Sequence, residues 1–265
     1  MVAMTSARVR RLGFAAVKGT RHLARDAVTL AADGPVGDRA FCLVDPESAR
    51  VLRTVEHPTL TCVEATTGDG GELRLRWPDG REVVGPLEAT DEAPLTVDPL
   101  LTVDYWGRAA TARLLDGPHS TALAAYLGRP VRLAATQPGE VVWAGAVSVV
   151  TTGELDRLRQ RMLGAGLTAP IALDERFRAT ITLDAEQDPE PGTRLRVGTA
   201  TIEVARRIDR CAVVDVDPAT GRRDVPVLAH LDRHEGLLTF GVDARVVQPG
   251  RVEMGDPATP ENPSH

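Results

Sequence analysis

The stretch RCAVVDVDPATG, residues 210–221, opens with an arginine and a cysteine. It follows a β-prone run at residues 200–204 and ends in turn-forming residues, so we expect a strand that leads into a turn. Because a neighbouring cation favours the thiolate over the thiol, Arg210 makes Cys211 a candidate nucleophile and soft metal ligand. The same pattern also fits a small buried hydrophobic residue beside a surface arginine, and both interpretations stay open.

The composition is that of an ordinary globular protein. The chain has 265 residues, 43% of them hydrophobic and 26% charged, which allows one large domain or two modest ones. A net charge of -6 argues against a general nucleic-acid binder or a protein of anionic membrane surfaces. Any site for an anion must therefore be local.

The cysteines do not form a recognisable framework. The chain has three cysteines, Cys42, Cys62 and Cys211. They form no CxxC pair and have no histidine at zinc-finger spacing, which argues against disulfides and against a cysteine-bound iron–sulfur cluster. No run of about 18 apolar residues occurs, and the apolar patch near the N-terminus is short. We expect a cytoplasmic protein that neither spans a membrane nor is exported.

Short strands separated by turn signals dominate the pattern. Expected strands lie at residues 8–18, 27–30, 40–44, 59–66, 72–77, 81–84, 179–184, 194–205, 210–216 and 239–247. Expected helices are brief, at 120–127 and 153–162, and residues 85–100 read as a proline-rich connection. The prediction is a mostly β fold with an N-terminal β domain at 1–110, a β-barrel at 111–257 and a disordered tail at 258–265.

Several basic and hydroxyl side chains accompany turn signals. Lys18 is the only lysine among 31 basic residues, and it either persists by chance or supplies a compact ammonium that arginine cannot replace. Basic and hydroxyl groups of this kind hold phosphates. We predict that five cations share one pocket, and because they would repel one another, a bound anion would have to accompany them. These cations are Lys18, Arg39, Arg176, Arg178 and Arg210.

Two residue pairs have competing interpretations. Arg176 and Arg178 would lie on the same face of a strand, which also fits a solvated edge. His230 and His234 would face together on a helix, but no carboxylate stands between them in a zinc-protease pattern, so we expect no metal site there.

An ordered set of motifs resembles one known family. Residues 17–19 are similar to the lysine turn of the MOSC N-terminal β-barrel domain, and residues 37–41 to its Asp-Arg strand. Further pieces resemble the MOSC domain itself, in order along the chain, and the Arg-Cys then Val-Asp-Pro-x-Thr-Gly segment is the most specific of them. These pieces are residues 176–178, 210–221, 240–242 and 249–256.

The resemblance implies a fold and a cofactor. The chain is similar to the amidoxime-reducing component and to the C-terminal domain of molybdenum cofactor sulfurase, which implies the molybdenum cofactor, Mo-molybdopterin. In the reducing enzymes of the family a cysteine is the molybdenum ligand, which carries over to Cys211 as catalytic residue and metal ligand. The family's pterin and phosphate contacts carry over to Lys18, Arg39, Thr151, Thr152, Arg176, Arg178 and Arg210. The resemblance does not point to pyridoxal phosphate.

Four positions differ from the family pattern. Gly19 stands where serine is usual, Thr180 where asparagine is expected, and Asp209 where serine precedes the arginine. Gly19, Thr180 and Asp209 remain candidate cofactor contacts. Asp243 replaces an expected aromatic residue, and the two carboxylates bring negative charge to a region where an anionic cofactor is expected.

Three functions from different classes are compatible with these residues. The first is a reductase of N-hydroxylated or N-oxide small molecules, which needs a separate electron donor such as a ferredoxin or flavin reductase because this chain cannot hold its own cluster. The second is a sulfur carrier in which a cysteine desulfurase loads a persulfide on Cys211. The third is a non-catalytic binding module.

Overall fold

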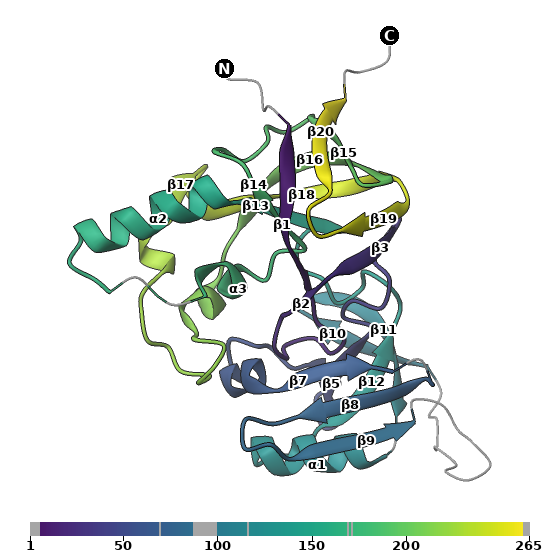
Figure 1. Ribbon diagram of the computed structural model, residues 1–265. Helices are drawn as coiled ribbons and strands as arrows, with labels where there is room; N and C mark the ends of the chain where they lie inside the picture. Colours follow the sequence, from purple (N-terminus) through teal and green to yellow (C-terminus); the bar gives the residue numbers. More distant parts are fainter. Residues whose placement is uncertain are drawn as a thin grey trace.

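A computed structural model describes residues 6–68, 70–86, 100–115, 117–168, 170 and 172–261. The chain is 45% strand and 17% helix, with two β-barrels of seven and five strands. The prediction of a mostly β fold is confirmed. Figure 1 shows the two barrels as stacked lobes, with the two chain ends together at the far end of the larger lobe.

The seven-stranded barrel is built from both ends of the sequence. Its strands, in order around the barrel, are β13 (Val147–Thr151), β14 (Ile181–Asp184), β1 (Ala7–Phe14), β20 (Pro257–Glu261), β15 (Arg194–Val197), β16 (Ala200–Asp209) and β18 (Leu237–Gln248). Pairing of β13 with β18 closes it. Strand β2 (Leu23–Arg25) adds to β1, β17 (Asp232–His234) adds to β18, and β3 (Ala27–Ala31) pairs with β4 (Gly34–Pro35) and β19 (Gly250–Glu253) in a separate small sheet.

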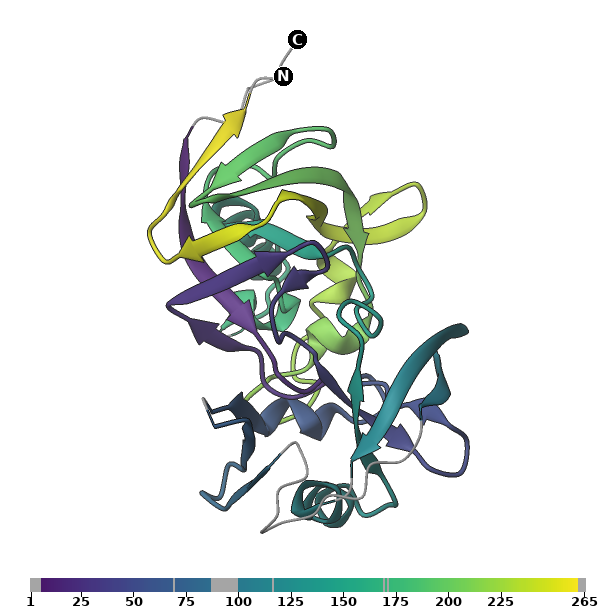
Figure 2. The same cartoon turned by 90° about the vertical axis from the view of Figure 1, so that its right-hand side faces the viewer.

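The five-stranded barrel comes from the first half of the chain. Its strands are β10 (Leu101–Tyr105), β11 (Arg108–Leu115), β12 (Arg132–Thr136), β5 (Phe41–Asp45) and β6 (Arg50–Val51). A meander of β7 (Glu64–Thr67), β8 (Glu72–Arg76) and β9 (Glu82–Pro86) lies beside it, with α1 (Pro118–Leu127) against β9 and β12. Figure 2 shows this lobe below the larger barrel from a second direction.

Alternating burial explains why these short segments form strands. In β8, Leu73 and Leu75 are fully buried while Arg74 and Arg76 are exposed, as a sheet with one dry face requires. In β1 the register shifts between Val9 and Arg11. A bulge of this kind changes the direction of a side chain, and the Arg11 side chain at this bulge is buried.

Three helices and three 3-10 turns complete the fold in the described residues. Helix α2 (Thr152–Gly164) buries Leu155, Leu158 and Met162, one face of a 3.6-residue repeat. The other helical segments are α3 (Leu173–Phe177), η1 (Pro58–Cys62), η2 (Ala212–Asp215) and η3 (Leu228–His230). No helix in the described part of the chain combines the length and hydrophobicity needed to cross a membrane.

Several expected elements differ from the structure. The two predicted helices are present and begin one or two residues earlier, at Pro118 and Thr152. The strand expected at 210–216 is instead the 3-10 turn η2, because the backbone leaves β16 at Asp209. Similarly, η1 replaces the first part of the strand expected at 59–66, where Pro58 begins a turn.

The expected division of the chain also differs from the architecture. Residue 110 lies inside β11, so a boundary there would cut the five-stranded barrel, and β1 from the N-terminal part belongs to the larger barrel. The tail expected to be disordered from residue 258 forms β20 as far as Glu261, since its backbone pairs with β1 and β15. Residues 262–265 and most of the expected connection, 87–99, lie outside the described residues.

Candidate functional site

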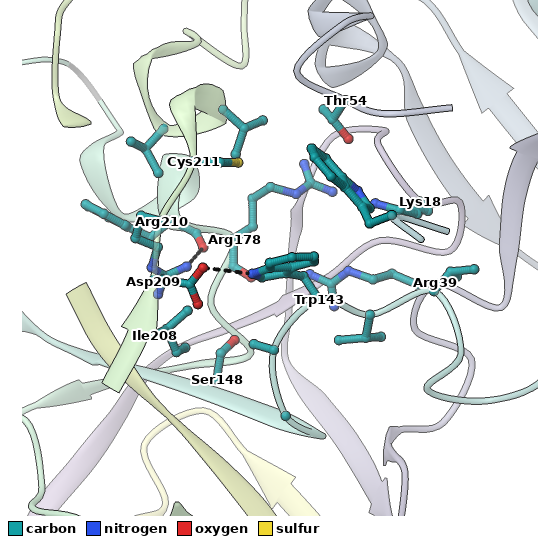
Figure 3. A pocket seen from close by; sticks show the side chains of 18 of the residues that line it. Lys18, Arg39, Thr54, Trp143, Ser148, Arg178, Ile208, Asp209, Arg210 and Cys211 are labelled. Carbon is teal, nitrogen blue, oxygen red and sulfur yellow. Dashed lines mark hydrogen bonds between the residues drawn. The ribbon is translucent and has the colours of Figure 1, made fainter. Parts of the chain in front are cut away.

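A cavity of about 200 Å³ lies where the two barrels meet. Lys18, Arg39 and Tyr105 reach it from the N-terminal half, and Arg178 and residues 208–211 reach it from the larger barrel. The segment at residues 141–146, between β12 and β13, borders it as well. In Figure 3, Lys18 and Arg39 lie on one side, Asp209, Arg210 and Cys211 on the other, and Trp143 between them.

Cys211 lines this cavity and is exposed, so it is not the small buried hydrophobic residue that the sequence also allowed. It follows β16 with extended backbone and precedes η2, so the sulfur sits at a sharp change of chain direction. Cys42 and Cys62 are buried. Burial raises the pKa of the Cys42 thiol to about 12 and raises that of Cys62.

Three basic side chains form what we call the cationic wall: Lys18, Arg39 and Arg178. Lys18 Nζ lies 4.9 Å from the centre of the Tyr105 ring. Burial, with Arg39 and Arg178 nearby, lowers the pKa of Lys18 to about 7. Among the described residues, no carboxylate lies within 4.0 Å of the charged nitrogens of Lys18 or Arg178.

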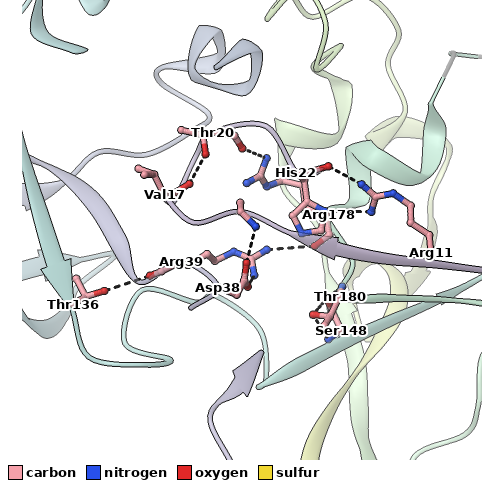
Figure 4. Close-up of polar contacts among 11 residues, drawn as sticks. Arg11, Val17, Thr20, His22, Asp38, Arg39, Thr136, Ser148, Arg178 and Thr180 are labelled. Carbon is pink, nitrogen blue, oxygen red and sulfur yellow. Dashed lines mark hydrogen bonds and ion pairs between the residues drawn. The ribbon is translucent and has the colours of Figure 1, made fainter. Parts of the chain in front are cut away.

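Arg39 and Arg178 are fixed by turns. Both have left-handed backbones, with φ of 49° and 52°. Arg39 pairs with Asp38, which accepts a hydrogen bond from the Ala15 amide at 2.8 Å, and its other terminal nitrogen donates to the Arg178 carbonyl (3.4 Å). Arg178 donates to the Thr20 carbonyl at 2.7 Å, and Figure 4 shows these contacts. Burial, with Arg39 close by, lowers the Arg178 pKa to about 9.

A second group of lining residues, the cysteine wall, consists of Asp209, Arg210 and Cys211, and Arg178 of the cationic wall lies next to it in Figure 3. Arg210 donates from Nε to the Phe240 carbonyl at 2.8 Å and from Nη1 to the Phe177 carbonyl at 2.9 Å. Burial lowers its pKa to about 10, partly opposed by Asp188. Its Nη2 is buried and has no hydrogen-bond partner among the described residues.

Four of the five cations predicted to share a pocket line this cavity, and Arg176 does not. Arg176 and Arg178 are not on a strand as expected, because residues 173–177 form α3. Residues two apart in a helix point in different directions. Arg176 is buried and forms two hydrogen bonds with Asp224, at 2.7 and 2.8 Å.

Other predicted site residues have partners elsewhere. Thr151 donates to Asp188 at 2.9 Å and Thr152 to Asp184 at 3.1 Å, and neither lines the cavity. Gly19 sits beside it: with φ of 93°, a Cβ there would lie 3.2 Å from Thr54 Oγ1. Thr180 does line the cavity, hydrogen-bonded with Ser148.

The two unexpected carboxylates have different positions. Asp209 lines the cavity, whereas Asp243 is buried behind it. Asp243 accepts a hydrogen bond from the Gly145 amide at 3.2 Å and lies 3.2 Å from Arg206 Nε. The Asp243 carboxylate therefore anchors the segment at residues 141–146, which borders the cavity.

His230 and His234 do not share a helix. His230 ends the 3-10 turn η3 and His234 lies on β17. The expectation that they form no metal site stands as a prediction from the sequence.

Sequence reasoning missed the aromatic part of the site. Tyr105, Trp106 and Trp143 line the cavity, and the two indole rings lie 5.6 Å apart. Trp143 keeps 50% of its surface exposed. Its signal in the sequence is weak: it is one of only three tryptophans, in a short segment that ends Trp143-Ala144-Gly145.

Comparisons with known proteins agree with this architecture. The model of the MOSC N-terminal beta barrel domain matches residues 6–128, and that of the MOSC domain matches residues 134–259. Among solved structures, the YuaD protein from Bacillus subtilis is similar over 97% of both chains, with 14% identity and a TM-score of 0.45. YiiM from Geobacillus stearothermophilus is similar over 44% of this chain and 54% of its own, with 21% identity and a TM-score of 0.31.

A search of curated proteins found no match. The match to the first family model ends at residue 128, directly after α1, and the match to the second begins at residue 134, inside β12. The chain belongs to the MOSC family and carries a MOSC N-terminal β-barrel domain followed by a MOSC domain.

Proposed function

We propose that this protein binds the molybdenum cofactor in the cavity between its barrels and reduces N-hydroxylated or N-oxide small molecules, with Cys211 as the molybdenum ligand. The observation that carries the proposal is the pairing of an exposed cysteine with the cationic wall across one cavity. Membership of the MOSC family supports it, because the family includes reductases that bind this cofactor.

The residues present fit such a group in two respects. A thiolate is a soft ligand suited to molybdenum, and Lys18 and Arg178 are cations without carboxylate partners in the described part of the chain. The described residues contain no cluster of three or more His, Cys, Asp or Glu side chains that could hold a metal ion. The proposal therefore requires the cofactor to supply the remaining ligands.

Each side chain has a distinct part in this mechanism. Lys18, Arg39 and Arg178 bind the cofactor's phosphate, and Arg210 holds the backbone beside Cys211 through the Phe177 and Phe240 carbonyls. With a pKa of about 7 before an anion arrives, Lys18 takes up a proton at Nζ when one binds. Trp143 lies between Lys18 and Asp209 in Figure 3 and offers an aromatic face to whatever binds there. The bound cofactor supplies two-electron reduction chemistry.

Electrons have to come from another protein. Of the three cysteines, Cys42 and Cys62 are buried and apart from the cavity lining, and Cys211 serves as the ligand. No second redox group is thus provided by cysteines of this chain. A ferredoxin or flavin reductase in the cytoplasm fits this role.

A sulfur carrier is the second candidate, favoured by the exposure of Cys211. In that reaction the Cys211 thiolate attacks the outer sulfur of a desulfurase persulfide. The donor's S–S bond breaks, its cysteine leaves as a thiolate, and Cys211 carries the sulfane sulfur. The nearby cations would stabilise the persulfide anion, and no metal is required.

Molybdenum and pterin analysis of the purified protein, with an intact mass after incubation with a cysteine desulfurase, tests these candidates. Molybdenum and pterin near one per chain support the reductase. Their absence together with a persulfide mass on Cys211 supports the carrier. Absence of both leaves a non-catalytic binding module and overturns the two catalytic proposals.

A further inference from the structure

Lys18 carries an amine that has no hydrogen-bond or ion-pair partner in the described part of the chain. The side chain lines the cavity between the barrels. Its Nζ lies over the Tyr105 ring, 4.9 Å from the ring centre. The amine is therefore open to a molecule that enters the cavity.

The backbone fixes where this amine lies. The Lys18 amide donates to the Phe41 carbonyl at 2.7 Å, and Val17 forms a parallel bridge with Phe41. The Thr20 hydroxyl donates to the Val17 carbonyl at 2.7 Å and closes the turn. These bonds tie Lys18 to β5 of the five-stranded barrel, so the amine is held at the cavity.

Two guanidinium groups in the same cavity make this amine nucleophilic. Arg39 and Arg178 line it together with Lys18, and in Figure 3 Arg178 lies between Lys18 and Cys211. Burial and these two cations lower the pKa of Lys18 to about 7, so most of the amine is neutral at pH 8. A lysine that is desolvated beside other cations is an activated nucleophile. Arginine cannot replace it, because its guanidinium stays protonated, and Lys18 is the only lysine of the chain.

Arg178 is the side chain best placed to hold an anionic group beside this amine. Its Nη1 donates to the Thr20 carbonyl at 2.7 Å, and among the described residues its Nε and Nη2 make no hydrogen bond. Arg39, by contrast, is paired with Asp38. An anion bound to Arg178 leaves the Lys18 amine free to react, and a neutral molecule of the same shape lacks this contact.

We infer that Lys18 captures small aldehydes that carry an anionic group, as an imine on Nζ, with Arg178 holding the anion. This is a further activity of the cavity, beyond the proposed function, because it needs neither molybdenum nor Cys211. An aldehyde bound in this way occupies the cationic wall and excludes any other anion from it.

The reaction is a condensation that needs no oxidant or reductant. The lone pair of the neutral Nζ attacks the carbonyl carbon, a C–N bond forms, and the carbonyl oxygen takes up a proton to give a carbinolamine. That oxygen then leaves as water while the C=N bond forms, and both hydrogens of the water come from the amine. The imine nitrogen takes up a proton from solvent, and the resulting cation keeps its contact with the Tyr105 ring.

Reductive trapping tests this reaction. The full chain, produced in a host that does not make the molybdenum cofactor, is incubated at pH 8 with 4-formylbenzoate or with neutral benzaldehyde. Cyanoborohydride reduces each imine to a stable secondary amine. Peptide mapping by mass spectrometry then gives the labelled fraction at Lys18 and at the N-terminal amine, which serves as the internal reference.

The measured quantity is the anionic preference: the ratio of 4-formylbenzoate to benzaldehyde labelling at Lys18, divided by the same ratio at the N-terminal amine. This division removes the intrinsic difference in reactivity between the two aldehydes. We expect an anionic preference of at least about ten in the folded protein, since the hydrogen bond to Arg178 is charge-assisted. In denaturing urea it should fall to about one, because unfolding separates Lys18 from Arg178.

Arg178→Met and Arg233→Met form the matched pair of variants. Arg178→Met should lower the anionic preference to near one while benzaldehyde still labels Lys18. Arg233 is exposed on β17, donates to the Gly236 carbonyl at 3.1 Å and does not line the cavity. Arg233→Met therefore removes one positive charge elsewhere and should keep the wild-type preference. Far-UV circular dichroism establishes that both variants fold.

Three results would overturn the inference: labelling of the folded protein at its N-terminal amine alone, no anionic preference at Lys18, or an equal loss of that preference in Arg233→Met. The proposed function is judged separately, on protein from a host that makes the cofactor. Molybdenum loading there without a Lys18 adduct in the cofactor-free protein contradicts this inference alone. A Lys18 adduct in a chain that never takes up molybdenum contradicts only the proposed function.

Discussion

The two walls of the cavity handle charge in opposite ways. On the cysteine wall, Arg210 is tied to main-chain carbonyls and its pKa shift is opposed by nearby carboxylates. On the cationic wall, burial and the neighbouring Arg39 lower the pKa of both Lys18 and Arg178. Of these three cations, Arg39 alone has a carboxylate within 4.0 Å among the described residues. The cysteine wall holds the backbone beside the Cys211 sulfur in place. The cationic wall is suited to binding an anion from outside the protein.

Two arginines only two residues apart, Arg176 and Arg178, also differ in whether their charge is paired. Arg176 is buried against Asp224, whereas Arg178 lines the cavity with no carboxylate within 4.0 Å among the described residues. The ion pair of Arg176 stabilises the fold. The unpaired charge of Arg178, close to Arg39, lowers the free energy of unfolding. A cation that destabilises the empty protein is a better indicator of a binding role than a cation that is paired.

Cysteine reactivity should show the largest contrast, because Cys211 is exposed in the cysteine wall whereas Cys42 is buried near Lys18 of the cationic wall. Burial and a pKa of about 12 leave Cys42 with a thiolate fraction on the order of one in ten thousand at pH 8. We expect exposed Cys211 to react with iodoacetamide at least about a hundredfold faster in the native state. Peptide mapping by mass spectrometry gives the order, and a faster reaction at Cys42 or Cys62 would place the reactive thiol elsewhere.

Replacing each arginine by methionine should separate the two roles. Arg176→Met breaks a buried ion pair and should lower the free energy of unfolding by roughly 3 kcal/mol. Arg178→Met removes a positive charge that lies close to Arg39, so the free energy of unfolding should stay unchanged or rise. Urea denaturation at pH 7 measures both, and equal losses would mean that Arg178 is also a structural residue.

Lys18 should make stability depend on pH. Its pKa is lowered from 10.5 to about 7 by folding, so the unfolded chain binds the extra proton between these values and stability rises with pH through that window. Wild type should gain roughly 1 to 2 kcal/mol over Lys18→Met between pH 7 and pH 9. Parallel urea titrations of both proteins check this, and identical pH profiles would show that Lys18 keeps its ordinary pKa.

The smallest effect concerns the turn that presents Lys18. Gly19 has φ of 93°, a conformation that an L side chain adopts with strain, so Gly19→Ala should cost about 1 kcal/mol. Gly164→Ala is the control, since its Cβ would meet nothing within 4 Å. Thermal unfolding of both variants distinguishes a strained turn from a general loss of chain flexibility.

The sequence predicted the β class and that Lys18, Arg39, Arg178 and Arg210 share one pocket, because turn signals and a lone lysine are local features. It did not predict that Arg176 turns away, since a helix of five residues, Leu173–Phe177, is too short to show a repeat. Trp143 and Tyr105 were missed for another reason. They come from segments far apart in the chain, and only the meeting of the two barrels brings them to one cavity.

The central claim is that both walls are needed to bind the cofactor. Measuring the cofactor content of variants in each wall tests it most directly. Molybdenum and pterin per chain are determined for wild type, Cys211→Ser and Arg178→Met, with Cys42→Ala as the control that spares the cavity lining. The account predicts that Cys211→Ser loses molybdenum, that Arg178→Met loses both molybdenum and pterin, and that Cys42→Ala keeps both. Full loading of Cys211→Ser and Arg178→Met would contradict it.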